Sequence, residues 1–137
     1  MLAEIYKSGV ARDLDLNCAE TVVYITNLAY DLGLGKNSMK MASGFGGGMF
    51  LEEKCGAVTG AFMVLGCLYL KDRAHEDGTI QKMVLSFHQK FNEKMGSCEC
   101  RPLKEKYRTP EKKCEAVIEA SLAVLDEMIL EHGRPVF

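Results

Sequence analysis

Six cysteines carry the most specific chemistry in this sequence: Cys18, Cys55, Cys67, Cys98, Cys100 and Cys114. Six in 137 residues is less than the ~8–10% of a short chain stapled by disulfides, but more than ordinary usage. A chain of this length can bury a core without disulfides. Thiolates bind zinc and iron–sulfur clusters, and pairs of thiols exchange electrons by forming disulfides. We therefore expect metal binding or redox chemistry.

The segment Met1–Lys7 bears on the compartment in which these thiols work. It has no basic region followed by an apolar stretch, and Glu4 stands where the apolar stretch would begin. We therefore expect no secretory signal and a cytoplasmic location. In that reducing compartment, several cysteines favour metal or redox chemistry over structural disulfides.

Composition limits the classes of partner. The chain is 47% hydrophobic and 26% charged, with a net charge of -2. These values predict one globular domain over residues 1–137 and do not favour nucleic acid as a partner. The longest uncharged stretch, Gly56–Leu70, has fifteen residues. A membrane span needs ~20, so we expect a buried core helix and no membrane span.

The elements that must position the cysteines are helices. Apolar residues recur every three or four positions, which predicts an all-α, single compact bundle of five to six helices. Asn17 followed by Glu20 is typical of a capping box, and Thr109-Pro110 is typical of a helix start. Long helical segments are expected at about 18–32, 55–71, 79–95 and 110–131. Short ones are expected at about 2–12, at about 38–43 and from the Ser97–Pro102 string to about 107.

Glycines gather in the middle of the chain. Seven of the thirteen lie between positions 44 and 66, which indicates left-handed backbone or backbone that closely approaches another group. We expect a cofactor to be approached by Gly46, Gly47, Gly48 and Gly56. The Gly56/Gly60 face also permits close helix packing, either within the monomer or against a second copy in a homo-oligomer.

Four cysteines lie at or near predicted helix starts: Cys18, Cys55, Cys100 and Cys114. A helix N-terminus favours anions and can lower the pKa of a thiol. If neighbouring long helices run antiparallel, these four residues meet at one end of the bundle. Cys67 lies within an apolar stretch and is expected in the core. Cys98 is either an accessory member of the site or a spare thiol in a loop.

Several strings of residues carry a family resemblance. Asn17-Cys18-Ala19-Glu20, the box Cys55-Gly56-Ala57-Val58-Thr59-Gly60, Cys100-Arg101 and Cys114 follow one another in order. Over about residues 17–124 this pattern resembles the redox-active protein family named C_GCAxxG_C_C. The resemblance implies a small, mostly prokaryotic protein that works with a redox partner protein in oxidoreductase or transporter systems. The same domain is similar to part of a multihaem cytochrome for which an iron–sulfur centre has been proposed.

Four mechanisms remain open for Cys18, Cys55, Cys100 and Cys114. They could ligate an iron–sulfur cluster, although their spacing is wider than in compact ferredoxin motifs. Two of them could cycle between dithiol and disulfide, with Cys55 as a nucleophile of lowered pKa. They could instead hold a structural zinc ion, or the chain could be a helical interaction protein without redox turnover. Arg101 is a candidate to stabilise the Cys100 thiolate.

Overall fold

The computed structural model describes residues 1–133, so residues 134–137 of the predicted domain lie outside the described part. Residues 1–133 form seven α-helices and no strand, which confirms the all-α class and exceeds the predicted five to six helices. The elements are α1 (Leu2–Lys7), α2 (Cys18–Tyr30), α3 (Lys36–Lys40), α4 (Gly56–Tyr69), α5 (Thr79–Met95), α6 (Cys100–Tyr107) and α7 (Glu115–His132), with the short turns η1 (Ser43–Phe45) and η2 (Gly48–Glu52).

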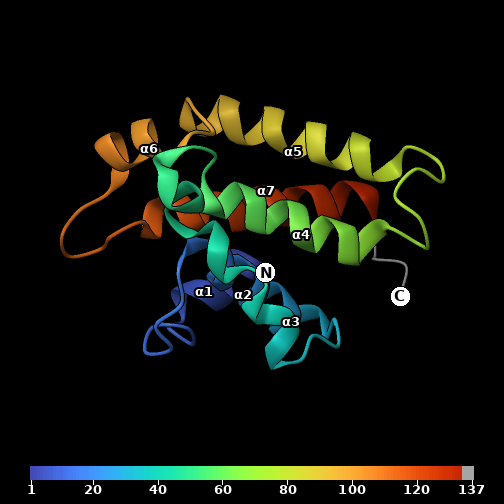
Figure 1. Ribbon diagram of the computed structural model, residues 1–137, viewed down its shortest axis with the longest axis horizontal. Coiled ribbons are helices and arrows are strands. Elements are labelled where there is room, and N and C mark those ends of the chain that lie inside the picture. The colour runs from blue at the N-terminus through green and yellow to red at the C-terminus, as the bar shows by residue number, and fades with distance from the viewer. Residues whose placement is uncertain (134–137) are drawn as a thin grey trace.

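The three long helices α4, α5 and α7 pack side by side, and α1, α2 and α3 lie along one edge of this group (Figure 1). The helix α5 runs opposite to α4, whereas α7 runs parallel to α4 (Figure 1). The starts of α4 and α7 therefore lie at the same end of the bundle as the end of α5. The short helix α6 follows α5 at this end.

Large apolar side chains fill the space between the long helices. Phe87 and Phe91 of α5 are fully buried, with ring centroids 5.8 Å apart, and Phe62 of α4 meets Phe87 edge-on at 5.9 Å. The fully buried Leu122 and Leu125 lie on α7. Burial of each such side chain contributes about 1.5–3 kcal/mol, so this core sets the relative positions of the helix ends. None of the helices within residues 1–133 is long and apolar enough to cross a lipid bilayer.

The start of α2 is fixed by the predicted capping box. The Asn17 side chain accepts from the Glu20 N–H at 3.0 Å, and the Glu20 side chain accepts from the Asn17 N–H at 3.0 Å. Asn17 also donates through Nδ2 to the Ser43 carbonyl at 2.9 Å. This bond ties the start of α2 to the glycine-rich segment.

Glycines allow α2 and α4 to pack closely. A Cβ atom at position 60 would lie 2.8 Å from the Ala19 carbonyl oxygen, and one at position 56 would overlap Cys18 Sγ. A real Cβ atom cannot approach so closely. The Gly56/Gly60 face is therefore used within the monomer, which resolves one alternative left open by the sequence.

The last helix begins later than the sequence predicts. Thr109 and Lys113 form a tight turn, with N–O distances of 3.3 and 2.7 Å between their backbones, and Lys113 has φ of 52°. This left-handed residue interrupts helical hydrogen bonding, so α7 begins at Glu115 and Cys114 becomes its N-cap. The prediction that Thr109-Pro110 starts the helix is wrong.

Candidate functional site

Cys18, Cys55, Cys100 and Cys114 all line one cavity of about 660 Å³. They come from four different elements, at the starts of α2, α4, α6 and α7. The topology explains the meeting, because α4 and α7 start at the same end of the bundle and α6 follows the end of α5 (Figure 1). The structure thus brings together the four cysteines that the sequence selects.

A short backbone pairing holds Cys55 beside Cys100. Lys54 and Glu99 form an antiparallel bridge. On one side of it the Cys55 N–H donates to the Cys98 carbonyl at 2.8 Å, and on the other the Cys100 N–H donates to the Glu53 carbonyl at 2.5 Å. Residues 45 positions apart in the sequence are therefore fixed as neighbours by main-chain bonds.

The four glycines predicted to approach a cofactor divide into two groups. Gly47 and Gly56 line the cavity, and the Gly47 N–H is a hydrogen-bond donor to the Cys18 sulfur. Gly46 and Gly48 instead leave room for site residues. A Cβ at position 46 would overlap the Asn17 side chain, and one at position 48 would lie 2.7 Å from Cys100 Cβ.

The glycine-rich segment ends in a left-handed turn. Gly47, Gly48, Met49 and Phe50 have consecutive φ values of 60°, 63°, 63° and 59°. A left-handed conformation costs roughly 1–2 kcal/mol at each non-glycine residue. Phe50 nevertheless has 76% of its surface exposed, and the next residue, Leu51, has 63%. The backbone is thus strained in a conformation that leaves large apolar side chains in solvent.

Burial dominates the protonation of the thiols. The pKa of Cys55 is raised to about 12, chiefly by burial and next by the nearby Cys18, and the N–H groups of Ala57 and Val58 oppose the shift. Burial is also the largest cause of the raised pKa of Cys18 and of Cys100. Desolvation therefore outweighs the helix N-terminus, and the predicted low pKa of Cys55 is wrong for the thiol without a bound cation.

An arginine missed by the sequence analysis contacts the site. Arg108 Nη1 lies 3.5 Å from Cys114 Sγ, because the turn between Thr109 and Lys113 brings the two residues together. Arg101 is the residue selected from the sequence, but its Nη2 atom instead lies 3.9 Å from Glu52 Oε1. No local pattern marks Arg108, since its proximity to Cys114 depends on the left-handed Lys113.

The spacing of the four cysteines can be compared with a known family. The family model described as "Putative redox-active protein (C_GCAxxG_C_C)" matches residues 16–128. The chain belongs to this family. The match contains all four cysteines of the cavity and agrees with the extent expected from the sequence. No curated protein and no solved structure matches the chain.

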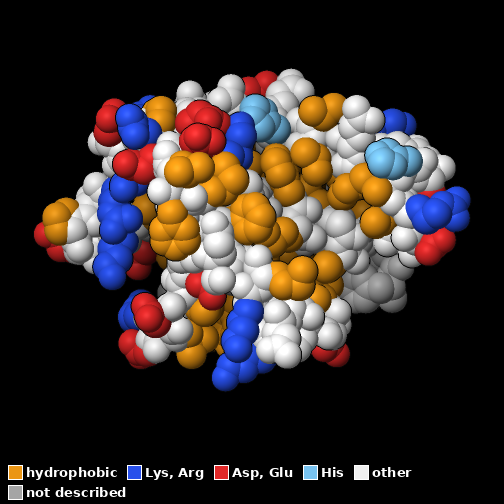
Figure 2. Space-filling view, in the orientation of Figure 1, with side chains coloured by type: hydrophobic (Ala, Val, Ile, Leu, Met, Phe, Trp, Pro, Cys, Tyr) orange, Lys and Arg blue, Asp and Glu red, His pale blue; other side chains and the backbone are white. Residues whose placement is uncertain are grey.

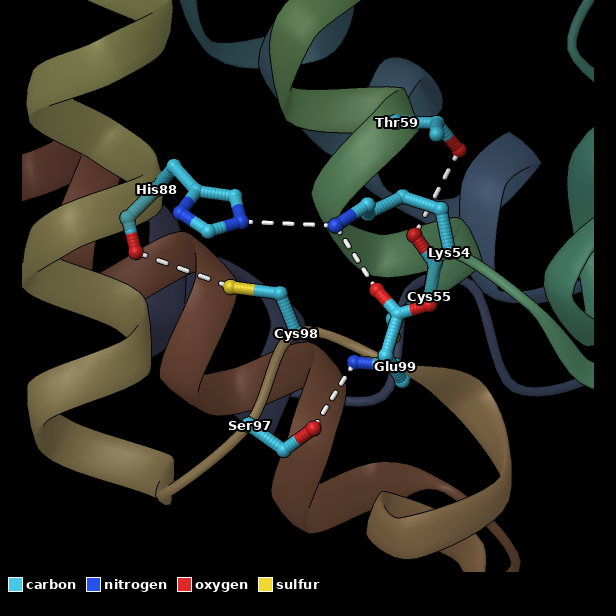
Figure 3. Close-up of polar contacts among 7 residues, drawn as sticks. All are labelled: Lys54, Cys55, Thr59, His88, Ser97, Cys98 and Glu99. Atoms are coloured by element: carbon cyan, nitrogen blue, oxygen red, sulfur yellow. Dashed lines mark hydrogen bonds and ion pairs between the residues drawn. The ribbon is translucent and has the colours of Figure 1, made fainter.

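The two cysteines outside the family pattern, Cys67 and Cys98, do not line the cavity. Cys98 is buried, and its thiol donates to the His88 carbonyl at 3.5 Å, toward α5 (Figure 3). Beside it, Lys54 Nζ lies 2.7 Å from Glu99 and 3.3 Å from His88 Nε2. The structure thus does not place Cys98 with the other four. Cys67 is exposed on α4, so the prediction that it belongs to the core is wrong.

The side chains that line the cavity determine which metal group it could hold. Four thiols are the ligand set of common iron–sulfur clusters and of some zinc sites. Within residues 1–133, no three His, Cys, Asp or Glu side chains are arranged to hold a single metal ion. A cluster suits a wider arrangement than a single ion does, because its four thiolates bind different iron atoms. Cys18, Cys55, Cys100 and Cys114 line one cavity, and their four thiols are the kind of donor set that such clusters use.

Proposed function

We propose that this protein is an electron-transfer protein in which Cys18, Cys55, Cys100 and Cys114 ligate an iron–sulfur cluster. The observation that supports this most is the lining of a single cavity by four cysteines from four elements. The cluster would supply one-electron transfer when bound. Free thiols persist in a reducing compartment, so the proposal places the protein in the cytoplasm with a redox partner protein.

The raised pKa values favour a metal group over free thiolates. Burial keeps Cys18, Cys55 and Cys100 protonated, and nearby sulfurs oppose one another's ionisation. Thiols that must ionise together in a buried cavity need a compensating positive charge, and metal binding supplies it by displacing the protons.

Residues of the chain would tune such a site. The N–H of Gly47 donates to the Cys18 sulfur, and the N–H groups of Ala57 and Val58 donate to the Cys55 sulfur. Hydrogen bonds to ligand sulfur stabilise the more negative, reduced state. The Arg108 guanidinium beside Cys114 acts in the same direction. The left-handed Gly47 therefore contributes a donor as well as a turn.

Dithiol–disulfide exchange is the second candidate, with Cys18 and Cys55 as the pair. Among the other cysteines, Cys18 has the largest effect on the pKa of Cys55, and its sulfur packs against Gly56. Two thiols would form one S–S bond and release two protons and two electrons to an oxidised partner protein. The exchange ranks second because a thiol with a pKa of about 12 is a poor nucleophile at neutral pH.

Anaerobic purification separates these functions. A cluster gives a brown protein with iron, acid-labile sulfide and sulfur-to-iron absorption, and Cys55→Ser removes all three. Cys67→Ser is the matched control, because Cys67 is exposed and does not line the cavity. A colourless protein with zinc supports a structural site, and a metal-free protein with a Cys18–Cys55 disulfide supports thiol exchange. If serine at all four cavity positions changes none of these properties, a non-redox helical interaction protein remains.

A further inference from the structure

The segment from Arg101 to Lys113 is strongly basic. It has six basic and two acidic residues, whereas the whole chain has a net charge of -2. The segment comprises α6 and the turn that leads to α7. Lys and Arg side chains gather at the end of the molecule where α6 lies (Figure 2). Six of the seventeen basic residues of the chain thus lie in this one segment.

This basic surface surrounds the approach to the cysteines. Four of its basic residues line the cysteine cavity: Lys104, Arg108, Lys112 and Lys113. The residues that line an adjoining surface groove of about 620 Å³ include Arg101, Lys104 and Arg108. Lys104 and Arg108 are shared with the cysteine cavity. A molecule that approaches the cavity from this side therefore meets positive charge first.

An exposed apolar turn adjoins the basic segment. Phe50 and Leu51 are 76% and 63% exposed, and the next residue, Glu52, lies 3.4 Å from Lys104 and 3.9 Å from Arg101. The same turn contains Gly48, which packs against Cys100. Large apolar side chains in solvent with charges beside them are typical of protein interaction sites. Strained backbone that persists in a fold also points to a functional role.

We propose that the segment Arg101–Lys113 and the turn Phe50–Leu51 together form a docking surface for an acidic redox protein. The partner would place carboxylates against the basic segment and an apolar patch against Phe50. Opposite charges would steer it to the end of the molecule that holds the cysteines. This inference rests on the proposed redox function, in which each electron lost by the partner is gained by the cysteine site.

The composition of the surface favours a protein over nucleic acid. A nucleic-acid surface presents cations to a row of phosphates, whereas here Glu52, Glu105 and Glu111 stand among the cations. Phe50 and Leu51 provide the apolar centre that a protein interface needs. The mixed surface thus fits a partner with both carboxylates and apolar side chains.

The probe for this surface is a small acidic ferredoxin, titrated onto the full chain by calorimetry at low and high salt. We expect binding that weakens with salt. We also expect at least about a tenfold loss of affinity for Arg101→Glu combined with Lys106→Glu, and for Phe50→Ser. The matched controls are Lys82→Glu and Leu85→Ser, which are exposed on α5 and should retain wild-type affinity.

Absence of ferredoxin binding would overturn the inference, as would equal loss in the controls. Tighter binding of basic cytochrome c or of duplex DNA than of the ferredoxin would also overturn it. A variant with serine at Cys18 and Cys55 separates docking from redox function, because neither residue belongs to the proposed surface. Retained binding with no electron transfer in this variant supports both proposals. Retained electron transfer contradicts the cysteine site and leaves the docking result intact.

Discussion

At the residue scale, the cysteine site depends on glycines, because a Cβ atom at these positions would occupy space that the cysteines fill. Gly56 lies where any Cβ atom would overlap Cys18 Sγ, and Gly48 lies where a Cβ would crowd Cys100. These glycines therefore set how closely sulfur can approach the backbone of another element. The clustering of glycines in the sequence is unusual, but only the packing of the folded chain shows which atoms occupy the space beside them.

The first prediction follows from this close approach. Gly56→Ala should lower the free energy of unfolding by about 1–3 kcal/mol, because the new methyl group must displace Cys18. The matched control is Gly66→Ala in the same helix, where a Cβ meets no atom within 4 Å. Alanine there should stabilise the protein by about 0.5–1 kcal/mol through helix propensity. Urea unfolding measures both, and equal changes would contradict the close packing at Gly56.

The second prediction concerns the Cys55 proton in reduced protein freed of metal by a chelator. Burial raises its pKa from 9.0 to about 12 in the folded state, so the folded state keeps a proton that the unfolded chain loses. The resulting stability is complete below pH 9 and is lost as pH rises toward 12. Over that window the unfolding free energy should fall by up to about 1.4 kcal/mol per pH unit because of this group. Cys55→Ala should reduce the slope between pH 9 and 10, and an identical slope in both proteins would contradict the assignment.

At the scale of elements, helices were more predictable than turns. The bounds of α5 follow from its apolar spacing and from Gly96, and the capping box of α2 was readable from Asn17 and Glu20. The start of α7 was not, because nothing in the local sequence requires a positive φ at Lys113. The thiol pKa was also mispredicted, since a helix start is visible in a sequence but the depth of burial is not.

The left-handed turn gives the third prediction. Phe50→Gly should stabilise the fold by about 1 kcal/mol, because glycine adopts the observed φ of 59° without strain. It should also weaken binding of the acidic partner, since the exposed ring is lost. Leu51→Gly is the control for strain, as Leu51 does not have a positive φ, and it should not be stabilising. Thermal unfolding together with ferredoxin titration measures both effects, and a destabilised Phe50→Gly protein would refute the strain.

At the scale of the whole molecule, the four cavity cysteines connect distant parts of the chain. Cys18 starts α2 and Cys114 caps α7, with Cys55 and Cys100 between them in sequence. We expect the bundle to fold around its apolar core without these sulfurs, because Phe87, Phe91 and Leu125 are fully buried and do not line the cavity. A group bound by all four residues would therefore link elements that are already packed, and would not create the fold.

The fourth prediction tests this link. A ligand that binds only the folded state raises the unfolding free energy by about 4 kcal/mol when its concentration is 1,000 times its dissociation constant. Chelator treatment should therefore lower the melting temperature by several degrees and leave helical circular dichroism at 20 °C unchanged, because the core remains. Cys114→Ser should show the lower melting temperature before treatment, whereas Cys67→Ser should match the wild type. Loss of helical signal on chelation would mean that the bound group is required for folding, and an unchanged melting temperature would contradict a metal link among the four elements.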